Sequence, residues 1–387
     1  MNGTDTLVLT GARVHCPDGT LAGGWLSVSG ERISAVGTGT PPAGRHLDLA
    51  GAHVVPGFVD VHCHGGGGGS FTSADPDEAR TAIETHRRHG TTSLMASLVS
   101  APPNALVDQL AALRELVTDG ELVGAHLEGP FIAEARCGAH DPSVLREPDD
   151  ATVGALLDAG DDIIRMVTLA PELTGAIKTV RRLTESGVIA AIGHTDAVAE
   201  QVRAAVDAGA TVATHLFNGM RPLHHREPGP VGVLLDDDRV TVELICDLVH
   251  VHPDVLRLAA RHAGRSRTVL VTDAMSATDV ADGRYRLGNL DVQVAGGVAT
   301  VPDTGSLAGS TLTMDVAFRN LVHDAGLDIA DAVAATASHP ATQLGIDTET
   351  GSLSPGLLAD LVVLDDDLRL TGVLRRGSWV VEPLPTA

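Results

Sequence analysis

Histidine, glutamate and aspartate follow short apolar runs at five places in the sequence. The first run, PGFVDVHCHG, carries Asp60, His62 and His64 at alternate positions, so on a strand these three side chains share one face that would point into a barrel. Burying two imidazoles and a carboxylate is costly unless they bind a metal or one another. Taken alone, this run fits a hydrogen-bonded histidine pair as well as it fits a metal site.

Four further runs favour the metal site. They end in HLE, GHT, THL and VTD, and their candidate residues are Glu128, His194, His215 and Asp273. Imidazoles and carboxylates that converge from several strands are ligands suited to Zn²⁺, Fe²⁺ or Mn²⁺. The pattern therefore predicts a divalent metal, with zinc as the first expectation and iron or manganese as alternatives.

The elements that must position these residues are eight apolar strand cores separated by amphipathic helices. The cores lie near residues 57–64, 91–99, 122–128, 163–170, 188–194, 210–216, 240–248 and 268–274. Repeated strand–helix units of this length favour an α/β fold, a closed (β/α)8 barrel of the TIM type rather than an open sheet. The carboxyl ends of barrel strands meet at one rim, where barrel enzymes hold their catalytic residues. All five polar runs end at this predicted rim.

Both ends of the chain have a different pattern, with short strands separated by Gly, Pro and Asp turns. Residues 1–55 and 345–387 are predicted to pair into one small β-sandwich domain, because neither end could bury its faces alone. Residues 56–344 are predicted to form the catalytic barrel. Within this range we expect three further elements, a β-rich insertion at 285–301 and helices near 312–325 and 329–344.

The composition argues against several classes of partner. The 387 residues carry 50 acidic and 27 basic side chains, and the resulting net charge of −23 repels nucleic acid and anionic membrane surfaces. Five Phe, two Trp and one Tyr are too few for base-stacking platforms. The four cysteines are scattered, no run of about 18 apolar residues occurs, and the N-terminus lacks an export pattern. We expect a cytoplasmic protein that binds neither nucleic acid nor membrane.

The order of the motifs resembles the amidohydrolase superfamily, and within it the deacetylases of phosphorylated amino sugars. The resemblance covers essentially the whole chain and rests on the segments PGFVDVHCHG, HLEGPF, GHTDA, THLFNGM, REPGPVG, DLVHVHP, LVTDAM and LAGSTLTMD. It implies metal-dependent hydrolysis of the acetamido group of N-acetylglucosamine-6-phosphate to glucosamine-6-phosphate and acetate, with no organic cofactor. It also implies that Glu128, His194 and His215 bind the principal metal and that Asp273 is the catalytic acid and base.

The same resemblance implies roles for residues around these ligands. His62 and His64 imply a second metal bridged by Glu128, so we expect one or two ions per subunit. His140 is assigned to polarise the acetyl carbonyl. The residues implied around the sugar are Ala139, Asn218, Gly219, His250, Leu307 and Ala308.

A positively charged loop, RPLHHREPG, is the expected binding element for a phosphate in this acidic chain. The resemblance matches Arg226 to a phosphate-binding arginine that reaches the site of a neighbouring subunit, and His250 to a phosphate or sugar ligand. It therefore implies a homodimer. On composition alone, a solvated loop without a ligand is the alternative.

Two other functions stay open. Another amidohydrolase could act on a cyclic amide such as a hydantoin or a dihydropyrimidine, or the chain could be a catalytically silent binding protein. Many binuclear amidohydrolases carry a carboxylated lysine on strand four, whereas the segment DIIRMVTLAPE has none and the sole lysine, Lys178, follows it. This absence also disfavours Schiff-base chemistry. The histidines outside the motifs, including His15, His53 and His86, are predicted to lie at the surface or to pack between helices.

Overall fold

The computed structural model describes residues 6–383, and its contacts divide the chain into two compact units. One unit contains the two ends of the chain, up to Asp60 and from Met314, together with His86–Ser93. The other consists of Val61–Thr85 and Leu94–Thr313. The domain limits at residues 55 and 345 stay a prediction, and residues 1–5 and 384–387, which those limits include, lie outside the described part.

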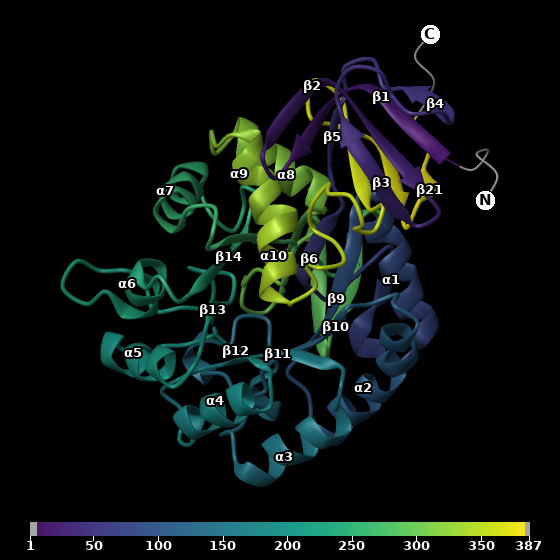
Figure 1. Ribbon diagram of the computed structural model, residues 1–387. Helices are drawn as coiled ribbons and strands as arrows, with labels where there is room; N and C mark the ends of the chain where they lie inside the picture. Colours follow the sequence, from purple (N-terminus) through teal and green to yellow (C-terminus); the bar gives the residue numbers. More distant parts are fainter. Residues whose placement is uncertain (1–5, 384–387) are drawn as a thin grey trace. The chain divides into compact units, whose positions relative to one another are not determined.

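An eight-stranded sheet joins strands from both ends of the chain (Figure 1). Its strands are β1 (Thr6–Cys16), β2 (Gly19–Ser29), β3 (Arg32–Gly37), β4 (Arg45–Asp48), β5 (His53–Pro56), β19 (Leu361–Leu364), β20 (Leu370–Arg375) and β21 (Ser378–Val381). The order is β21–β20–β19–β5–β1–β2–β3, and β4 pairs with β1. Leu9, Leu26, Val54, Leu361 and Leu374 belong to one buried cluster. The two ends of the chain therefore share one hydrophobic core, and their strands belong to one sheet.

His15 and His53 contradict the prediction for the histidines outside the motifs. They lie on the neighbouring strands β1 and β5, and both are buried. Their rings stack with centroids 5.1 Å apart, and His15 Nε2 lies 2.8 Å from His53 Nδ1. Burial and the neighbouring His53 lower the pKa of His15 to about 4, so the pair is uncharged at neutral pH. The prediction failed because isolated histidines at buried strand positions carry no spacing signal.

The eight predicted parallel strands form the barrel. They are β6 (Phe58–Cys63), β9 (Thr91–Val99), β10 (Gly124–Glu128), β11 (Ile164–Leu169), β12 (Ile189–Ile192), β13 (Val212–Ala213), β14 (Thr241–Ile245) and β15 (Thr268–Val271). Neighbours in the sheet follow the chain order from β6 to β15. At the seam, the Asp273 N–H donates to His62 O at 2.8 Å and the His64 N–H donates to Ala274 O at 2.7 Å. The α/β fold with a nearly closed barrel is thereby confirmed.

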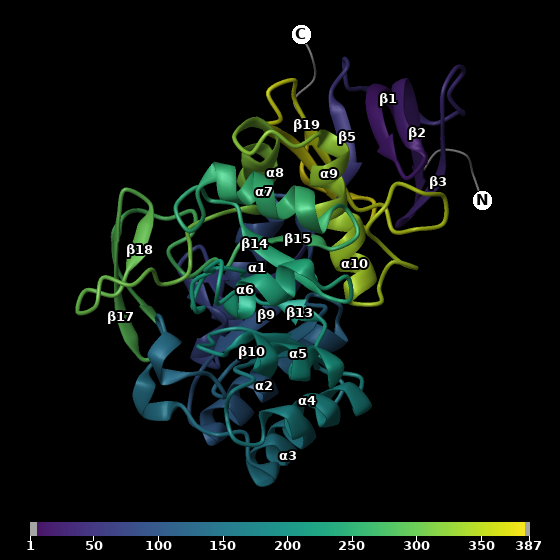
Figure 2. The same ribbon diagram turned by 90° about the vertical axis from the view of Figure 1, so that its left-hand side faces the viewer.

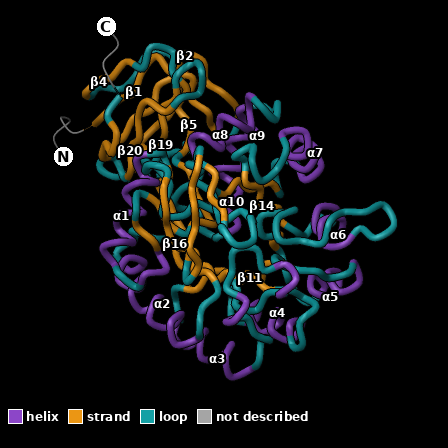
Figure 3. Tube along the Cα trace, turned by 180° about the vertical axis from the view of Figure 1, so that it is seen from behind, coloured by secondary structure: helices purple, strands orange, loops and turns teal. Residues whose placement is uncertain are grey.

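Apolar strands and amphipathic helices alternate around this barrel because parallel strands are covered on both faces. All nine residues of β9 are buried. The helices between the strands are α1 (Pro76–Arg88), α2 (Pro103–Thr118), α3 (Asp150–Ala159), α4 (Ala176–Glu185), α5 (Ala199–Asp207), α6 (Gly229–Asp236) and α7 (Pro253–Ala263). Figure 3 shows α2 to α5 in purple outside the orange strands of their unit.

The remaining elements of the described chain are short. After β6 come β7 (Gly65–Gly66), β8 (Gly69–Ser70) and η1 (Phe71–Ser73), and the loop after β10 contains η2 (Glu134–Arg136) and η3 (Pro142–Val144). The predicted insertion is a three-stranded sheet of β16 (Gly283–Leu287), β17 (Leu290–Ala295) and β18 (Val298–Thr300), shown in green in Figure 2. The final helical segments are α8 (Met314–His323), α9 (Ile329–Val333), the π-helical η4 (Ala334–Ser338) and α10 (His339–Gln343). No helix in the described residues is both long and apolar enough to cross a membrane.

Candidate active site

One rim of the barrel collects polar residues from all five sequence runs. Glu128 is the last residue of β10, and His194, His215 and Asp273 each lie two residues after the end of β12, β13 and β15. All are buried, with Asp273 the most exposed at 7%. His62 and His64, from the end of β6, are buried beside them.

The backbone at this rim is strained where three of these side chains leave it. His194, His215 and Asp273 have φ values of +48°, +29° and +49°. Residues other than glycine rarely adopt such values, and they cluster at functional sites. Gly219 also has a positive φ, and a Cβ atom there would lie 2.7 Å from His194 Nδ1. A glycine at position 219 is therefore required for the backbone to pass this close to the His194 ring.

The first ligand group lies around one oxygen of Glu128. Its Oε1 atom is 3.1 Å from His194 Nε2 and 2.8 Å from His215 Nε2. The two Nε2 atoms are themselves 3.1 Å apart. These three atoms form a compact set that could hold one divalent ion.

The second ligand group lies around the other oxygen of Glu128. Its Oε2 atom is 3.2 Å from His64 Nε2 and 3.6 Å from His62 Nε2. Asp273 Oδ1 lies 3.1 Å from His64 Nε2 and 3.6 Å from His62 Nε2, and His62, His64 and Asp273 could hold a metal together. Glu128 thus presents one oxygen to each group, which is the geometry that a bridging carboxylate requires.

The outer ring nitrogens show that both groups fit a metal. His194 Nδ1 donates to Arg136 O at 2.7 Å, and His64 Nδ1 donates to Ser97 O at 3.1 Å. Because a carbonyl can only accept, the proton lies on Nδ1 and the lone pair on Nε2 points inward. Two inward lone pairs beside ionised carboxylates repel one another unless a cation lies between them. This pattern is typical of metal-bound histidines, whose second nitrogen is held by a carbonyl or a carboxylate.

The pKa shifts of the ligand residues also indicate that the site favours a bound positive charge. Burial opposes protonation of His64, yet the carboxylates of Asp273 and Glu128 raise its pKa to about 9. Burial likewise opposes ionisation of Glu128, but His62 and His140 hold its pKa well below the usual range. The carboxylates therefore stay ionised and attract either protons or a metal.

His140 differs from these ligands in its tautomer. The Ser100 N–H donates to His140 Nδ1 at 3.2 Å, so the proton of the neutral ring lies on Nε2. Burial lowers the His140 pKa to about 4, which keeps the ring neutral. Its Nε2 lies 3.3 Å from Glu128 Oε2. With this tautomer the neutral His140 ring can donate from Nε2 in the site, and its position beside Glu128 and His194 also places it among the residues that could hold a metal.

A pocket of about 250 Å³ opens onto both ligand groups. Its lining includes most of the predicted sugar-contacting residues, namely Ala139, Asn218, Gly219, His250 and Leu307. Ala308 is not among the lining residues, because its side chain is buried in the apolar cluster under the insertion. His250 donates from Nδ1 to Asp247 Oδ2 at 2.6 Å. Burial opposes protonation, but Asp247 raises the His250 pKa, which suits a ligand for an anion.

Arg226 does not reach this pocket within the single chain. It is exposed, its Nη1 lies 2.7 Å from His225 Nε2, and it is not among the pocket-lining residues. Lys178 also lies away from the site, exposed on α4 and paired with Asp150. The site therefore lacks a lysine, as the sequence predicts.

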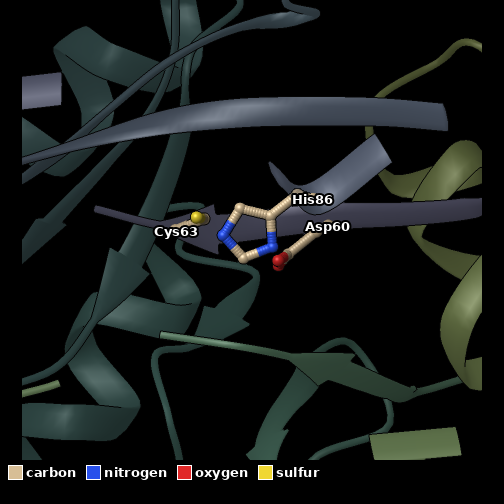
Figure 4. A group of neighbouring side chains, drawn as sticks. All are labelled: Asp60, Cys63 and His86. Atoms are coloured by element: carbon tan, nitrogen blue, oxygen red, sulfur yellow. The ribbon is translucent and has the colours of Figure 1, made fainter. Parts of the chain in front are cut away.

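Asp60 does not join His62 and His64, although it shares their alternation on β6. Its carboxylate instead lies within 4.8 Å of the Cys63 thiol and of a ring nitrogen of His86. Figure 4 shows the Asp60 carboxylate beside the His86 imidazole of α1, with Cys63 from the same strand as Asp60. The predicted grouping of Asp60 on one face with His62 and His64 therefore does not hold, because Asp60 lies together with Cys63, which was expected on the other face.

Three contributing residues were missed by the sequence reasoning. Glu243 on β14 is fully buried against His62, Asp247 holds His250, and Ser100 fixes the His140 tautomer. The signal available for Glu243 was a lone glutamate inside the apolar run TVELIC. Ser100 contacts His140 Nδ1 through its backbone N–H at 3.2 Å and through its hydroxyl at 2.9 Å, and nothing in the sequence indicated this contact.

Comparisons with known proteins agree with a hydrolytic metal site. The profile of the amidohydrolase family matches residues 53–380. An N-acetylgalactosamine-6-phosphate deacetylase from Escherichia coli O157:H7 is 39% identical over 327 residues, covering 84% of this chain and 86% of that protein. An N-acetylglucosamine-6-phosphate deacetylase from Danio rerio is 39% identical over 353 residues, covering 87% of each chain.

A solved structure is still more similar. It is a mutant of N-acetyl-D-glucosamine-6-phosphate deacetylase from Mycobacterium smegmatis in complex with N-acetyl-D-glucosamine-6-phosphate. The two chains superpose with a TM-score of 0.94 at 49% sequence identity. The match covers 97% of this chain and 100% of the other.

Proposed function

Because the chain belongs to the amidohydrolase family, we propose that it hydrolyses the acetamido group of N-acetylglucosamine-6-phosphate to glucosamine-6-phosphate and acetate. The similar proteins from Danio rerio and Mycobacterium smegmatis carry the name of this activity. The observation that supports it most directly is Glu128, whose two oxygens face two separate groups of histidines at the floor of the pocket. A cyclic-amide hydrolase with a bridging lysine is not favoured, because Lys178 is exposed outside the pocket.

The ligand groups imply one or two divalent ions per subunit, with zinc as the first candidate. Glu128, His194 and His215 would hold the principal ion, and His62 and His64 a second. Such an ion makes a bound water acidic and polarises a carbonyl.

The protein's own residues then move the protons and orient the amide. Asp273, ionised and beside the ligand groups, accepts a proton from the attacking water and returns it to the departing amine. His140 donates from Nε2 to the acetyl oxygen as negative charge develops there. Asn218, Gly219 and Leu307 enclose the sugar.

The phosphate end of the substrate is assigned to His250 and Arg226. His250 lines the pocket and is held by Asp247, whereas Arg226 lies outside it on its own chain. A homodimer in which Arg226 enters the partner's pocket supplies the guanidinium that a phosphate prefers. We propose that this dimer is cytoplasmic. We also propose that the chain divides at residues 55 and 345 into a catalytic barrel and a smaller β domain formed by the two ends.

Acetate release from a panel of substrates tests the proposed function. The panel contains N-acetylglucosamine-6-phosphate, its galactose epimer, unphosphorylated N-acetylglucosamine and a dihydropyrimidine. We expect the phosphorylated glucosamine to be preferred over the unphosphorylated sugar by about 10- to 100-fold in kcat/KM, the worth of one charged hydrogen bond. Hydrolysis of the cyclic amide alone would refute the assignment, and a preference for the galactose epimer would move it to that sugar.

Replacing Arg226 by Ala tests the phosphate ligand. Loss of one charged hydrogen bond costs about 1.5–3 kcal/mol, so KM for the phosphorylated sugar should rise roughly 10- to 100-fold. Turnover of the unphosphorylated sugar should hardly change. Arg203→Ala, which removes an exposed arginine on α5, is the matched control. An unchanged phosphate preference in Arg226→Ala would remove this residue from recognition.

Mixing inactive Asp273→Asn protein with Arg226→Ala protein tests whether Arg226 acts across the interface. Under conditions that exchange subunits, Asp273→Asn and Arg226→Ala chains form mixed dimers in which one site holds both intact residues. Activity should then recover in part. Absence of recovery despite demonstrated exchange would place Arg226 in the site of its own subunit.

A further inference from the structure

Leu287 is the large apolar side chain that the β-rich insertion contributes to the pocket. It is the last residue of β16, it is 4% exposed, and it lines the pocket beside the polar residues of the ligand groups. The other four residues of β16 alternate between partly buried and exposed positions. This strand is therefore buried at its tip, where it reaches the pocket, and not along its length.

The tip of the β16–β17 hairpin lies against the two segments that position His140. A Cβ atom at Gly288 would lie 2.8 Å from Val99 Cγ2, so the hairpin backbone passes close to the end of β9. The residue after Val99 donates its backbone N–H to His140 Nδ1. The Asn289 side-chain amide donates to the carboxylate of Asp141, which follows His140 in the chain. The last residue of β16 is thereby held near the His140 ring.

An apolar cluster keeps the Leu287 side chain in this place. Leu287 belongs to the cluster together with Ala139 and Met275. Ala139 directly precedes His140, and Met275 follows Asp273 by two residues. The cluster therefore joins the insertion to the segments that carry both of these groups. Because close-packed side chains yield little, Leu287 cannot easily move away from a ligand in the pocket.

The acetyl methyl is the apolar end of the substrate in the proposed reaction. In the proposed mechanism His140 donates to the acetyl oxygen, and the methyl is bonded to the same carbonyl carbon. The methyl therefore lies near the side chains around His140. Ala139, Leu287 and Leu307 are the apolar side chains in the pocket lining. Leu287 is the larger of the two that are fully buried, and Leu307 is partly exposed.

The size of the pocket leaves little room for a longer acyl group. Its volume of about 250 Å³ lies below the roughly 300–1,000 Å³ of most ligand pockets. An added methylene beyond the acetyl methyl would need space that the Leu287 side chain fills. Forcing extra carbon atoms into a packed place displaces side chains and is unfavourable.

We propose that Leu287 determines which N-acyl group the enzyme accepts, by contacting the acetyl methyl and excluding longer chains. The proposal rests on the proposed deacetylase function and adds the acyl specificity of that same site. It assigns Leu287 no part in the transfer of protons or in the binding of a metal.

The test compares the N-acetyl, N-propionyl and N-butyryl forms of glucosamine-6-phosphate. Release of glucosamine-6-phosphate, the product common to all three, gives kcat/KM for each. The wild type should prefer acetyl over propionyl by about 10- to 200-fold, the worth of one methylene in an apolar pocket. Leu287→Ala should reduce this preference by about tenfold or more, because it opens space for the added carbon. Leu287→Val, which removes one carbon, should shift the preference in the same direction by a smaller factor.

Two further variants separate a direct contact from a general loosening. Val294→Ala removes a buried side chain from the same insertion and the same cluster, but Val294 is not among the pocket-lining residues. Leu307→Ala enlarges the pocket at its other apolar side chain. Neither change should alter the preference for acetyl over propionyl. Circular dichroism and thermal unfolding verify that each variant is folded.

Several results would overturn the proposal. A wild type without a preference among the three acyl groups would show that the pocket does not select them. An unchanged preference in both folded Leu287 variants would remove this residue from acyl recognition. An equal loss of preference in Val294→Ala would assign the effect to the packing of the insertion, and a loss in Leu307→Ala alone would assign the acyl group to Leu307. Failure of the proposed function is distinct, because the wild type would then release no glucosamine-6-phosphate from any of the three sugars.

Discussion

Glu128→Gln should lower deacetylation by at least about 10³-fold and remove bound metal from both ligand groups. The amide has one oxygen and one NH₂ group, so it cannot offer an acceptor to each group as the carboxylate does. Without the ion, water in the site would lose the lowered pKa that a bound divalent ion supplies. The expected loss of activity is therefore larger than the loss from replacing a residue that contacts a ligand residue but does not itself bind the metal. Elemental analysis and acetate release measure it.

Chelation supplies the comparison for this variant. Wild-type protein treated with a chelator should lose activity and regain it with Zn²⁺, whereas Glu128→Gln should not respond to the added ion. Glu185→Gln, which changes an exposed glutamate, should behave as the wild type. Full activity of the wild type after verified removal of metal would contradict the metal-dependent mechanism.

Asp273→Asn should lower kcat by about 10²–10⁴, the usual worth of positioned general acid–base catalysis. The amide keeps the shape of the carboxylate but cannot accept a proton. Asp273 leaves the rim after β15 with a positive φ and lies within 3.1 Å of His64 Nε2, so its place in the site is fixed by the backbone. Substrate binding should persist, and kcat and KM from initial rates separate the two effects.

Asp158→Asn, an exposed aspartate of α3, is the control for the loss of one negative charge. A near wild-type kcat in Asp273→Asn would exclude this residue as the acid and base. A raised KM with an unchanged kcat would instead make it a binding residue.

The barrel could be predicted because each of its strands is buried on both faces and so has a continuous apolar run. The site could be predicted for a related reason, since Glu128, His194, His215 and Asp273 each end such a run. The site residues that could not be predicted are those whose role depends on contacts between segments far apart in the sequence. Glu243 and His62 are 181 residues apart, and neither position shows that the other lies 3.3 Å away.

The alternation of side chains along a single strand was also not sufficient to predict which residues lie together. It grouped Asp60 with His62 and His64, whereas the Asp60 carboxylate lies in one group with Cys63 and His86. It also could not show that His15 and His53 stack on neighbouring strands, since strand pairing is set by the whole sheet. The role proposed for Arg226 would depend on a second subunit, which the pattern of a single chain does not describe.

The seam between β6 and β15 sets an order of events during synthesis of the chain. The ribosome has made Glu128, His194 and His215 well before it reaches Asp273, whose N–H bonds to His62 O across the seam. At about 5–20 residues per second, several seconds separate these points. During that interval the nascent chain already contains every member of the first ligand group, while His62 and His64 still await the strand that closes the barrel beside them. The two ligand groups are therefore completed one after the other, and the His62–His64 group, which lies nearest the seam, is completed last.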